Sequence, residues 1–189
     1  MIKIATHDSA TGERGKGLLS LLVTPFAKTQ CKTIRQQYDA GCRMFDIRCK
    51  LIKGTWYCAH GLWHTKRTLE DIITEIAQYE DRCHVMMTYE GGESHNEEML
   101  DMCMRMRQRL KHIIWGPISV KYGKDSNGLR VKYSILQTSQ SGFGANEQGF
   151  LPLDGRSWHI LLPIPWLWKK LYGQTKEFND EKYVFVDFL

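Results

Sequence analysis

Apolar positions along the chain recur with two different periods. Alternating or continuous apolar runs predict about eight short β-strands. They cover residues 2–6, 43–50, 55–59, 84–89, 118–122, 131–137, 158–162 and 183–188. Helical spacing predicts three helices, over residues 31–39, 68–79 and 96–112. Strands that alternate with helices favour an α/β fold with a parallel sheet, and this many strands favour a barrel over an open sheet.

The stretch of residues 68–79 gives the clearest helix signal. Leu69, Ile72 and Ile76 recur at helical spacing, and Thr68 is followed three residues later by Asp71, a variant of the capping box. Helical patterns are rarer in the second half of the chain. We therefore expect a small, irregular and distorted TIM-barrel-like fold, formed by residues 1–189 as a single domain.

The composition is that of a folded globular protein, with 42% hydrophobic and 25% charged residues. The formal net charge of +5 indicates attraction to anionic partners. Basic residues are scattered, however, and the densest pairs are Lys66-Arg67 and Lys169-Lys170. Because no basic arm or tail is present, we do not expect a nucleic-acid partner.

The cysteines have no spacing typical of a metal site, and several lie inside apolar runs. We expect these six to be reduced and buried: Cys31, Cys42, Cys49, Cys58, Cys83 and Cys103. No stretch has the apolar length of a membrane span, and the N-terminus lacks a signal-peptide pattern. We therefore expect a cytoplasmic monomer, or a secreted protein if a leader was removed.

The segment RMFDIRCKL carries charges inside an apolar strand. Asp46 and Arg48 are two residues apart and share one side of the strand, whereas Phe45, Ile47 and Cys49 share the other. The apolar side is expected to pack against helices. The charged side is then expected to point into the barrel or a cleft.

Ionisable residues also end other predicted strands. In α/β barrels the carboxyl ends of the strands surround the active site, so side chains far apart in sequence converge there. The residues at these ends are His7-Asp8, Arg48, His60, Glu90 and Asp187.

Each of these positions also has a structural explanation. Asp8 or Ser9 could cap a turn, as such residues often do. Asp46 and Arg48 could form a structural ion pair, and His60 could be a hydrogen-bonded histidine at a strand end. Taken singly these explanations are preferred. The shared position at strand ends favours an active site, because independent caps have no reason to choose the same end.

The residue types point to phosphate chemistry. His7 and His60 provide a general base and a general acid, since imidazole titrates near neutral pH. The Arg48 guanidinium can stabilise charge on a phosphoryl oxygen. Asp8 and Asp187 can orient an imidazole and stabilise its cationic form. Together these groups favour acid–base cleavage of a phosphodiester.

Three motifs carry a resemblance to a known family. THDSATG, GCRMFDIRCKL and YCAHG, in this order, resemble the X-domain of phosphatidylinositol-specific phospholipase C in its bacterial form. A looser resemblance extends to VMMTYE and YVFVDF. The resemblance implies a distorted TIM barrel that cleaves the bond between phosphate and diacylglycerol. The inositol 2-hydroxyl would be the nucleophile, and the products would be a cyclic phosphodiester and diacylglycerol.

The resemblance also implies roles for individual residues. His7 would be the general base, and His60 the general acid that protonates the leaving alcohol. Asp8 would assist His60, Arg48 would stabilise the phosphate, and Asp187 would orient His7.

Arg48 stands where calcium-dependent members of that family have an acidic residue, which implies a metal-independent enzyme without a cofactor. Asp8, Asp46 and Glu90 could still attract a cation, but the guanidinium among them argues against one. We expect Asp46 and Glu90 to contact the substrate.

A phospholipid substrate requires contact with a membrane surface. Two apolar segments are candidates, KGLLSLLVTPF at residues 16–26 and LLPIPWLWKKLYG at residues 161–173. The second combines Trp166 and Trp168 with Lys169-Lys170, a composition typical of a membrane interface. Its aromatic residues could equally pack in the core.

Two other functions stay open from the sequence. One is a metal-dependent glycerophosphodiesterase or a barrel like sphingomyelinase D, which would need an acidic metal cluster. The other is a non-catalytic protein that binds phosphorylated headgroups or an anionic protein partner.

Overall fold

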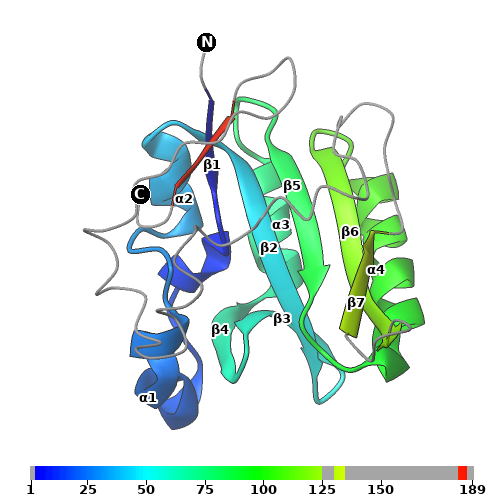
Figure 1. Cartoon of the computed structure of the whole chain (residues 1–189). Coiled ribbons are helices and arrows are strands. Elements are labelled where there is room, and N and C mark those ends of the chain that lie inside the picture. The colour runs from blue at the N-terminus through cyan, green and yellow to red at the C-terminus, as the bar shows by residue number, and fades with distance from the viewer. Residues whose placement is uncertain (1–2, 125–129, 135–182, 187–189) are drawn as a thin grey trace.

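A computed structural model describes residues 3–124, 130–134 and 183–186. Its strands form an eight-stranded sheet (Figure 1). They are β1 (Lys3–Thr6), β2 (Cys42–Ile52), β3 (Thr55–His60), β4 (Trp63–Thr68), β5 (His84–Tyr89), β6 (Ile114–Lys124), β7 (Arg130–Ser134) and β8 (Tyr183–Val186). The helices are η1 (Ser9–Gly12), α1 (Gly17–Ala27), α2 (Ile34–Asp39), α3 (Leu69–Ala77), η2 (Glu93–His95) and α4 (Asn96–Arg109).

Strand β2 is the centre of the sheet. It pairs in parallel with β1 and β5, and antiparallel with β3. Strands β8 and β6 extend the parallel part on either side, while β4 and β7 pair antiparallel with β3 and β6. The fold is therefore α/β as expected, but the sheet is mixed.

The described strands do not close into the expected barrel, and the sheet that they form is not purely parallel. A two-residue turn of Lys53 (φ 49°) and Gly54 (φ 76°) joins β2 to β3. Such a turn makes a hairpin, whereas a parallel crossover needs a dozen residues or more. Strand β3 therefore folds back along β2 instead of adding a parallel barrel strand.

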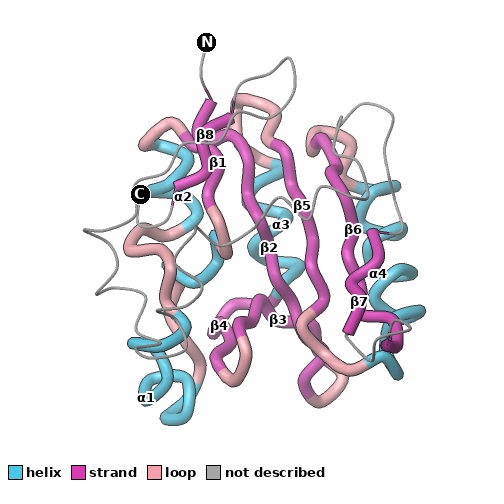
Figure 2. Tube along the Cα trace, in the orientation of Figure 1, coloured by secondary structure: helices cyan, strands magenta, loops and turns pink. Residues whose placement is uncertain are grey.

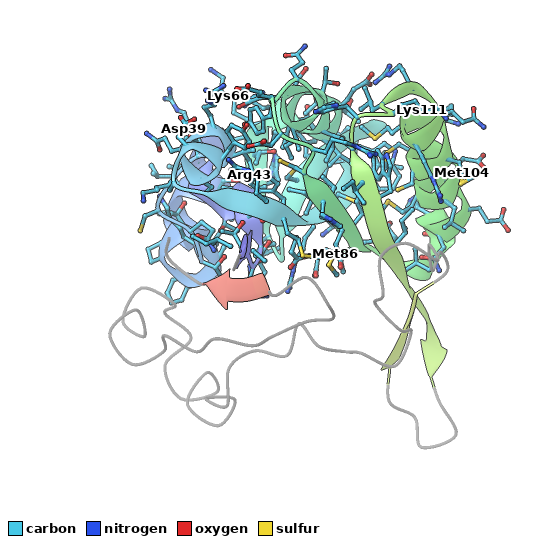
Figure 3. The ribbon with its side chains drawn as sticks, turned by 90° about the horizontal axis from the view of Figure 1, so that it is seen from above. Asp39, Arg43, Lys66, Met86, Met104 and Lys111 are labelled. Carbon is cyan, nitrogen blue, oxygen red and sulfur yellow. The ribbon has the colours of Figure 1, made fainter. Side chains whose placement is uncertain are left out.

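The helices and the charged residues lie on opposite sides of the sheet. Helices α2, α3 and α4 cover one side (Figures 2 and 3). Met86 points away from them, toward the other side (Figure 3). Because β5 pairs Met86 with Asp46 and Thr88 with Arg48, both charged residues of β2 also face the side without these helices.

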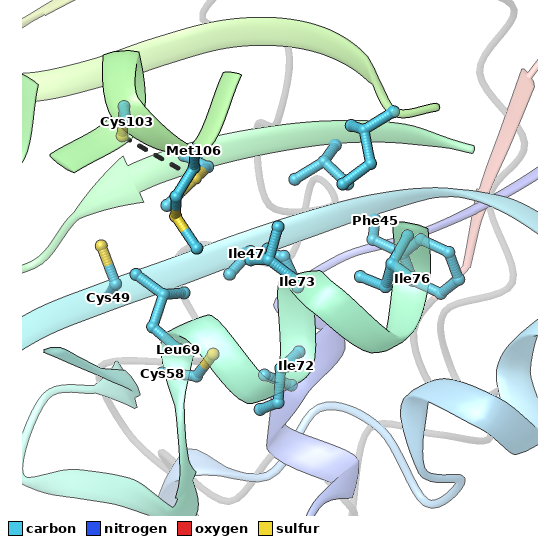
Figure 4. Packing of buried hydrophobic residues seen from close by; sticks show 14 of the residues in the cluster. Phe45, Ile47, Cys49, Cys58, Leu69, Ile72, Ile73, Ile76, Cys103 and Met106 are labelled. Atoms are coloured by element: carbon cyan, nitrogen blue, oxygen red, sulfur yellow. Dashed lines mark hydrogen bonds between the residues drawn. The ribbon is translucent and has the colours of Figure 1, made fainter. Parts of the chain in front are cut away.

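The core lies between β2 and α3 (Figure 4). Its central side chains are fully buried: Phe45, Ile47, Cys49, Leu69, Ile72, Ile73 and Ile76. Thr68 and Asp71 form the capping box expected at the start of this helix. The predicted division of β2 into an apolar and a charged side is thus confirmed.

Other expectations have mixed outcomes. Strand β5 has the expected bounds, but α1 and β4 were not expected as a helix and a strand. Five of the free cysteines are buried as expected, whereas Cys31 is exposed. The strand expected at residues 158–162 lies outside the described residues. In the described part of the chain, no helix is both long enough and apolar enough to span a bilayer.

Candidate active site

The turn after β1 carries the first two candidate residues. Asp8 has a left-handed backbone (φ 50°, ψ 47°), which is uncommon for a residue other than glycine. It precedes η1, but its carboxylate makes no capping hydrogen bond there. The alternative of an Asp8 turn cap is therefore wrong. Thr11 holds the turn instead, because it donates to the Asp8 carbonyl from N at 3.0 Å and from Oγ1 at 2.8 Å.

Two further polar residues position this turn. Thr29 Oγ1 and Gln30 Nε2 donate to the His7 carbonyl at 3.2 and 3.0 Å. Both are buried, and Thr29 Oγ1 also lies 2.9 Å from Thr11 Oγ1. The sequence did not identify Thr11, Thr29 or Gln30 as supports of the site. These residues do not directly follow a strand and have no periodic pattern, so only the fold shows their role.

Arg48 lies among three carboxylates. Its Nε is 3.4 Å from Asp46 Oδ2 and 3.8 Å from Asp8 Oδ1, and its Nη1 is 3.4 Å from Glu90 Oε1. Burial acts to lower the pKa of Arg48, but these three charges raise it above its ordinary value. Asp46 Oδ2 also accepts from Asp8 N at 3.2 Å, which ties β2 to the turn after β1.

His7 approaches the same guanidinium. Its Nε2 lies 2.5 Å from Arg48 Nη2 and 4.0 Å from Asp46 Oδ2. A guanidinium can only donate hydrogen bonds, so Nε2 is the acceptor in any hydrogen bond between these two side chains. A general base accepts a proton through the same lone pair.

His60 has the opposite electrostatic environment. Its Nδ1 forms an ion pair with Asp8 Oδ2 and lies 3.1 Å from the Ala27 carbonyl oxygen. The Asp8 charge raises the pKa of His60, although burial opposes it. For Asp8 itself burial acts to raise the pKa, but Arg48 and His60 lower it below its usual value. Both shifts favour an imidazolium beside a carboxylate, and a protonated imidazole is the form that a general acid requires.

His60 reaches the site by a route that differs from the expected one. Strand β3 is antiparallel, so it does not run toward the carboxyl edge with the parallel strands but returns to that edge from the β2–β3 turn. The hairpin pairs Cys58 with Cys49, and His60 follows two residues later. The returning strand therefore brings His60 back to the level of Arg48.

Burial separates the charged groups into two layers. The side chains of Asp8 and Asp46 are 2% exposed, whereas Arg48 is 15%, His7 20% and His60 30% exposed. Asp8 and Asp46 are thus more deeply buried than the two imidazoles and the guanidinium. These three more exposed groups are the ones that a phosphodiester could contact first.

Six of the expected site residues belong to this connected cluster: His7, Asp8, Asp46, Arg48, His60 and Glu90. Asp187 lies outside the described residues. Among the residues that are described, no group of three acidic, histidine or cysteine side chains is arranged to hold a metal ion. The cation within the carboxylate cluster is Arg48.

The two apolar segments have different outcomes. Residues 161–173 lie outside the described residues. Residues 16–26 fall almost entirely in α1, which exposes five large apolar side chains by 51–71%: Leu18, Leu19, Leu21, Leu22 and Phe26. The C-terminal residue of this helix, Ala27, is the one whose carbonyl lies against His60.

A cavity of about 710 Å³ lies away from the charged cluster. It is bounded by the β2–β3 turn and by parts of α3 and α4, including Trp56, Thr68 and Arg105. No residue of the charged cluster lines it. The candidate site is therefore defined by its charges and not by this cavity.

Solved structures of bacterial phosphatidylinositol-specific phospholipase C are similar to this chain in fold. A pentafluoro-Phe variant of the Staphylococcus aureus enzyme has a TM-score of 0.53 at 15% identity, over 97% of this chain and 70% of that one. A second S. aureus structure, from work on the modulation of its membrane binding, has a TM-score of 0.50 at 15% identity, over 98% of this chain and 85% of that one.

The Listeria monocytogenes enzyme matches with a TM-score of 0.44 and 23% identity, over 56% of this chain. The match spans only 39% of the Listeria chain. Comparison with protein-family models finds no match, and neither does comparison with curated protein sequences. At these identities the likeness shows the fold alone.

Proposed function

We propose that this chain is a metal-independent phosphodiesterase that cleaves an inositol phospholipid by attack of a headgroup hydroxyl. The observation that carries the proposal is that two histidines share one charged cluster with an arginine. His7 lies against Arg48, whereas His60 is paired with buried Asp8. A base and an acid in the same site as a cation suit in-line displacement at phosphorus.

The proposed reaction uses both histidines. His7 accepts the proton of the inositol 2-hydroxyl, and that oxygen forms a new bond to phosphorus. The bond from phosphorus to the glycerol oxygen breaks, and His60 donates its proton to that oxygen. The products are a cyclic phosphodiester and diacylglycerol, and proton exchange with water restores both imidazoles.

The other groups support this step. Arg48 would hold a non-bridging phosphate oxygen, and Asp8 would stabilise the cationic form of His60. Glu90 and Asp46 would contact the headgroup from the floor of the site. Asp187 would orient His7, as the family resemblance implies.

Helix α1 supports contact with a lipid surface. Its five exposed apolar side chains are followed by Lys28, and its last carbonyl touches His60. An apolar helix side next to a basic residue suits a membrane interface. We propose that α1 inserts among the headgroups and so brings the bilayer to the site.

Substitution of the two histidines tests the proposal. We expect His7→Ala and His60→Ala each to lower kcat/KM on phosphatidylinositol vesicles by about 10²–10⁴-fold, because each removes one proton transfer. His95→Ala is the matched control, since His95 is a half-exposed histidine paired with Glu98 outside the cluster. Wild-type rates in either site variant would contradict the proposal.

The leaving group separates the roles of the two histidines. In an inositol phosphate ester of p-nitrophenol, the p-nitrophenolate ion leaves without needing a proton. His60→Ala should therefore lose far less activity on this ester than on the lipid. His7→Ala should lose about as much on both, because the attacking hydroxyl is the same. Equal losses for His60→Ala on both substrates would exclude its role as general acid.

A further inference from the structure

A second group of cationic side chains lies next to the candidate active site. Lys16 Nζ donates to Tyr57 Oη at 2.6 Å and lies 4.3 Å from the centre of that ring. The Tyr57 ring packs edge-to-face on His64, with ring centres 5.5 Å apart. Lys50 is the cross-strand partner of Tyr57. We call Lys16, Lys50, Tyr57 and His64 the lysine cluster.

The lysine cluster continues the charged side of β2. Residues Asp46, Arg48 and Lys50 alternate along an unbroken register with β5 and β3, so they share one side of the strand. Two residues along a strand span about 7 Å. Because cross-strand partners share a side, Tyr57 lies on the same side of the sheet as Arg48, opposite Lys50.

Backbone contacts fix the position of Lys16. Its N donates to the His64 carbonyl at 2.9 Å, and His64 N donates to Ser20 Oγ at 3.2 Å. These bonds attach the start of α1 to β4. Lys16 precedes a helix with no side-chain cap and no acidic residue in its first turn. The helix N-terminus therefore adds a partial positive charge to the cluster.

The positive charge of the lysine cluster is not neutralised within the described residues. No carboxylate there forms an ion pair with Lys16 or Lys50. Burial lowers the pKa of His64, and the charges of Lys16 and Lys50 lower it further. Arg48, in contrast, already faces three carboxylates.

We infer that the lysine cluster binds a second anionic group of the substrate, a phosphate monoester on the headgroup beside the diester that Arg48 holds. The inference rests on the proposed function and adds a substrate class to it. The two lysines supply charge, while Tyr57 and His64 supply neutral hydrogen-bonding groups. A ring that reaches from Arg48 to Lys50 would place one phosphate at each.

The test compares two substrates in vesicles of neutral phosphatidylcholine. One is phosphatidylinositol, and the other carries one more phosphate monoester on the ring. The double variant Lys16→Met, Lys50→Met should lower kcat/KM roughly tenfold or more on the phosphorylated lipid, because two charged contacts are lost. On phosphatidylinositol its kcat/KM should change by less than about threefold.

Lys66→Met with Lys111→Met is the matched control. It removes the same charge from exposed lysines, which Figure 3 places toward the helix-covered side. Both substrates should be cleaved as by the wild type. Equal losses on both substrates in the cluster variant would overturn the inference. So would an equal loss on the phosphorylated lipid in the control variant.

A binding experiment separates this inference from the proposed function. If the wild type cleaves neither lipid, calorimetry with soluble inositol 1,4-bisphosphate still tests the lysine cluster. The wild type and the control variant should bind it. The cluster variant should bind it at least about tenfold more weakly. Absence of binding by the wild type, or equal binding by the cluster variant, would overturn the inference.

Discussion

The two sides of strand β2 differ completely although their residues alternate along one segment. On the side that faces α3, the side chains of Phe45, Ile47 and Cys49 are fully buried among apolar side chains. Toward the side away from α2, α3 and α4 it presents Asp46 and Arg48, which pair with each other and with carboxylates that follow β1 and β5. One side gains stability from apolar burial, whereas the other buries charges only because each has a partner.

This difference predicts opposite responses to substitution. An apolar side chain can be shortened at a cost that depends on the cavity left behind and not on pH. A charge removed from a paired network leaves its partners buried and unpaired, and the cost then follows their protonation. The following experiments use that contrast, from the largest expected effect to the smallest.

Arg48→Met should lower the free energy of unfolding by about 3–5 kcal/mol at neutral pH, because Asp8 and Asp46 lose their cation. The loss should shrink at acidic pH, where the carboxylates become protonated. Urea unfolding at several pH values measures both. Arg48→Lys is the control that keeps the charge. A loss that is the same at all pH values would contradict the charge pairing.

Ile47→Ala, one residue away, should lower the free energy of unfolding by about 2–5 kcal/mol through a cavity against α3. This loss should be constant with pH, in contrast to that of Arg48→Met. The same unfolding series measures it. A pH-dependent loss here would mean that the two sides of β2 are not independent.

Asp8→Asn should change how stability and activity depend on pH. The raised pKa of His60 contributes stability that is full below about pH 6.5 and is lost as pH rises through the folded-state pKa. The lowered pKa of Asp8 contributes stability above about pH 3.8 that is lost as pH falls through its folded-state value. The variant should lose both contributions.

In the same variant the pKa of His60 should fall toward that of a free imidazole. The alkaline limb of the profile of kcat/KM against pH, which requires protonated His60, should therefore move to lower pH. Histidine NMR titration measures the pKa directly. An unchanged His60 pKa would show that Asp8 does not hold the imidazolium.

Thr68→Ala should have the smallest effect, about 1 kcal/mol, because it removes the capping box of α3 but no buried side chain. Thermal unfolding measures the loss, and His60 should keep its pKa. Thr65→Ala is not a suitable control because Thr65 is fully buried. A changed His60 pKa would indicate that α3 and the charged side are coupled.

The apolar side of β2 could be predicted because its cause is local. The period of two in RMFDIRCKL and the helical period of α3 each follow from neighbouring residues alone. Most elements were therefore located from the sequence. Helix α1 was missed because its apolar residues are exposed, so they carry no core-facing pattern.

The charged side could be predicted only in part, because its geometry depends on contacts across the chain. Candidate residues at strand ends were found, but the route of His60 depends on the Lys53-Gly54 turn, which converts β3 into an antiparallel strand. The buried supports Thr29 and Gln30 act only through the His7 carbonyl. No sequence pattern records such a contact.

Phosphorus NMR of the product tests the central claim most directly, that a headgroup hydroxyl attacks the phosphate between His7 and His60 without a metal. The wild type is incubated with phosphatidylinositol vesicles in excess EDTA, and spectra are recorded from the first turnovers. We predict that the signal of a cyclic phosphodiester appears first and at the rate seen without EDTA. An acyclic phosphate ester as the first product, or activity lost in EDTA and restored by a divalent cation, would contradict the claim.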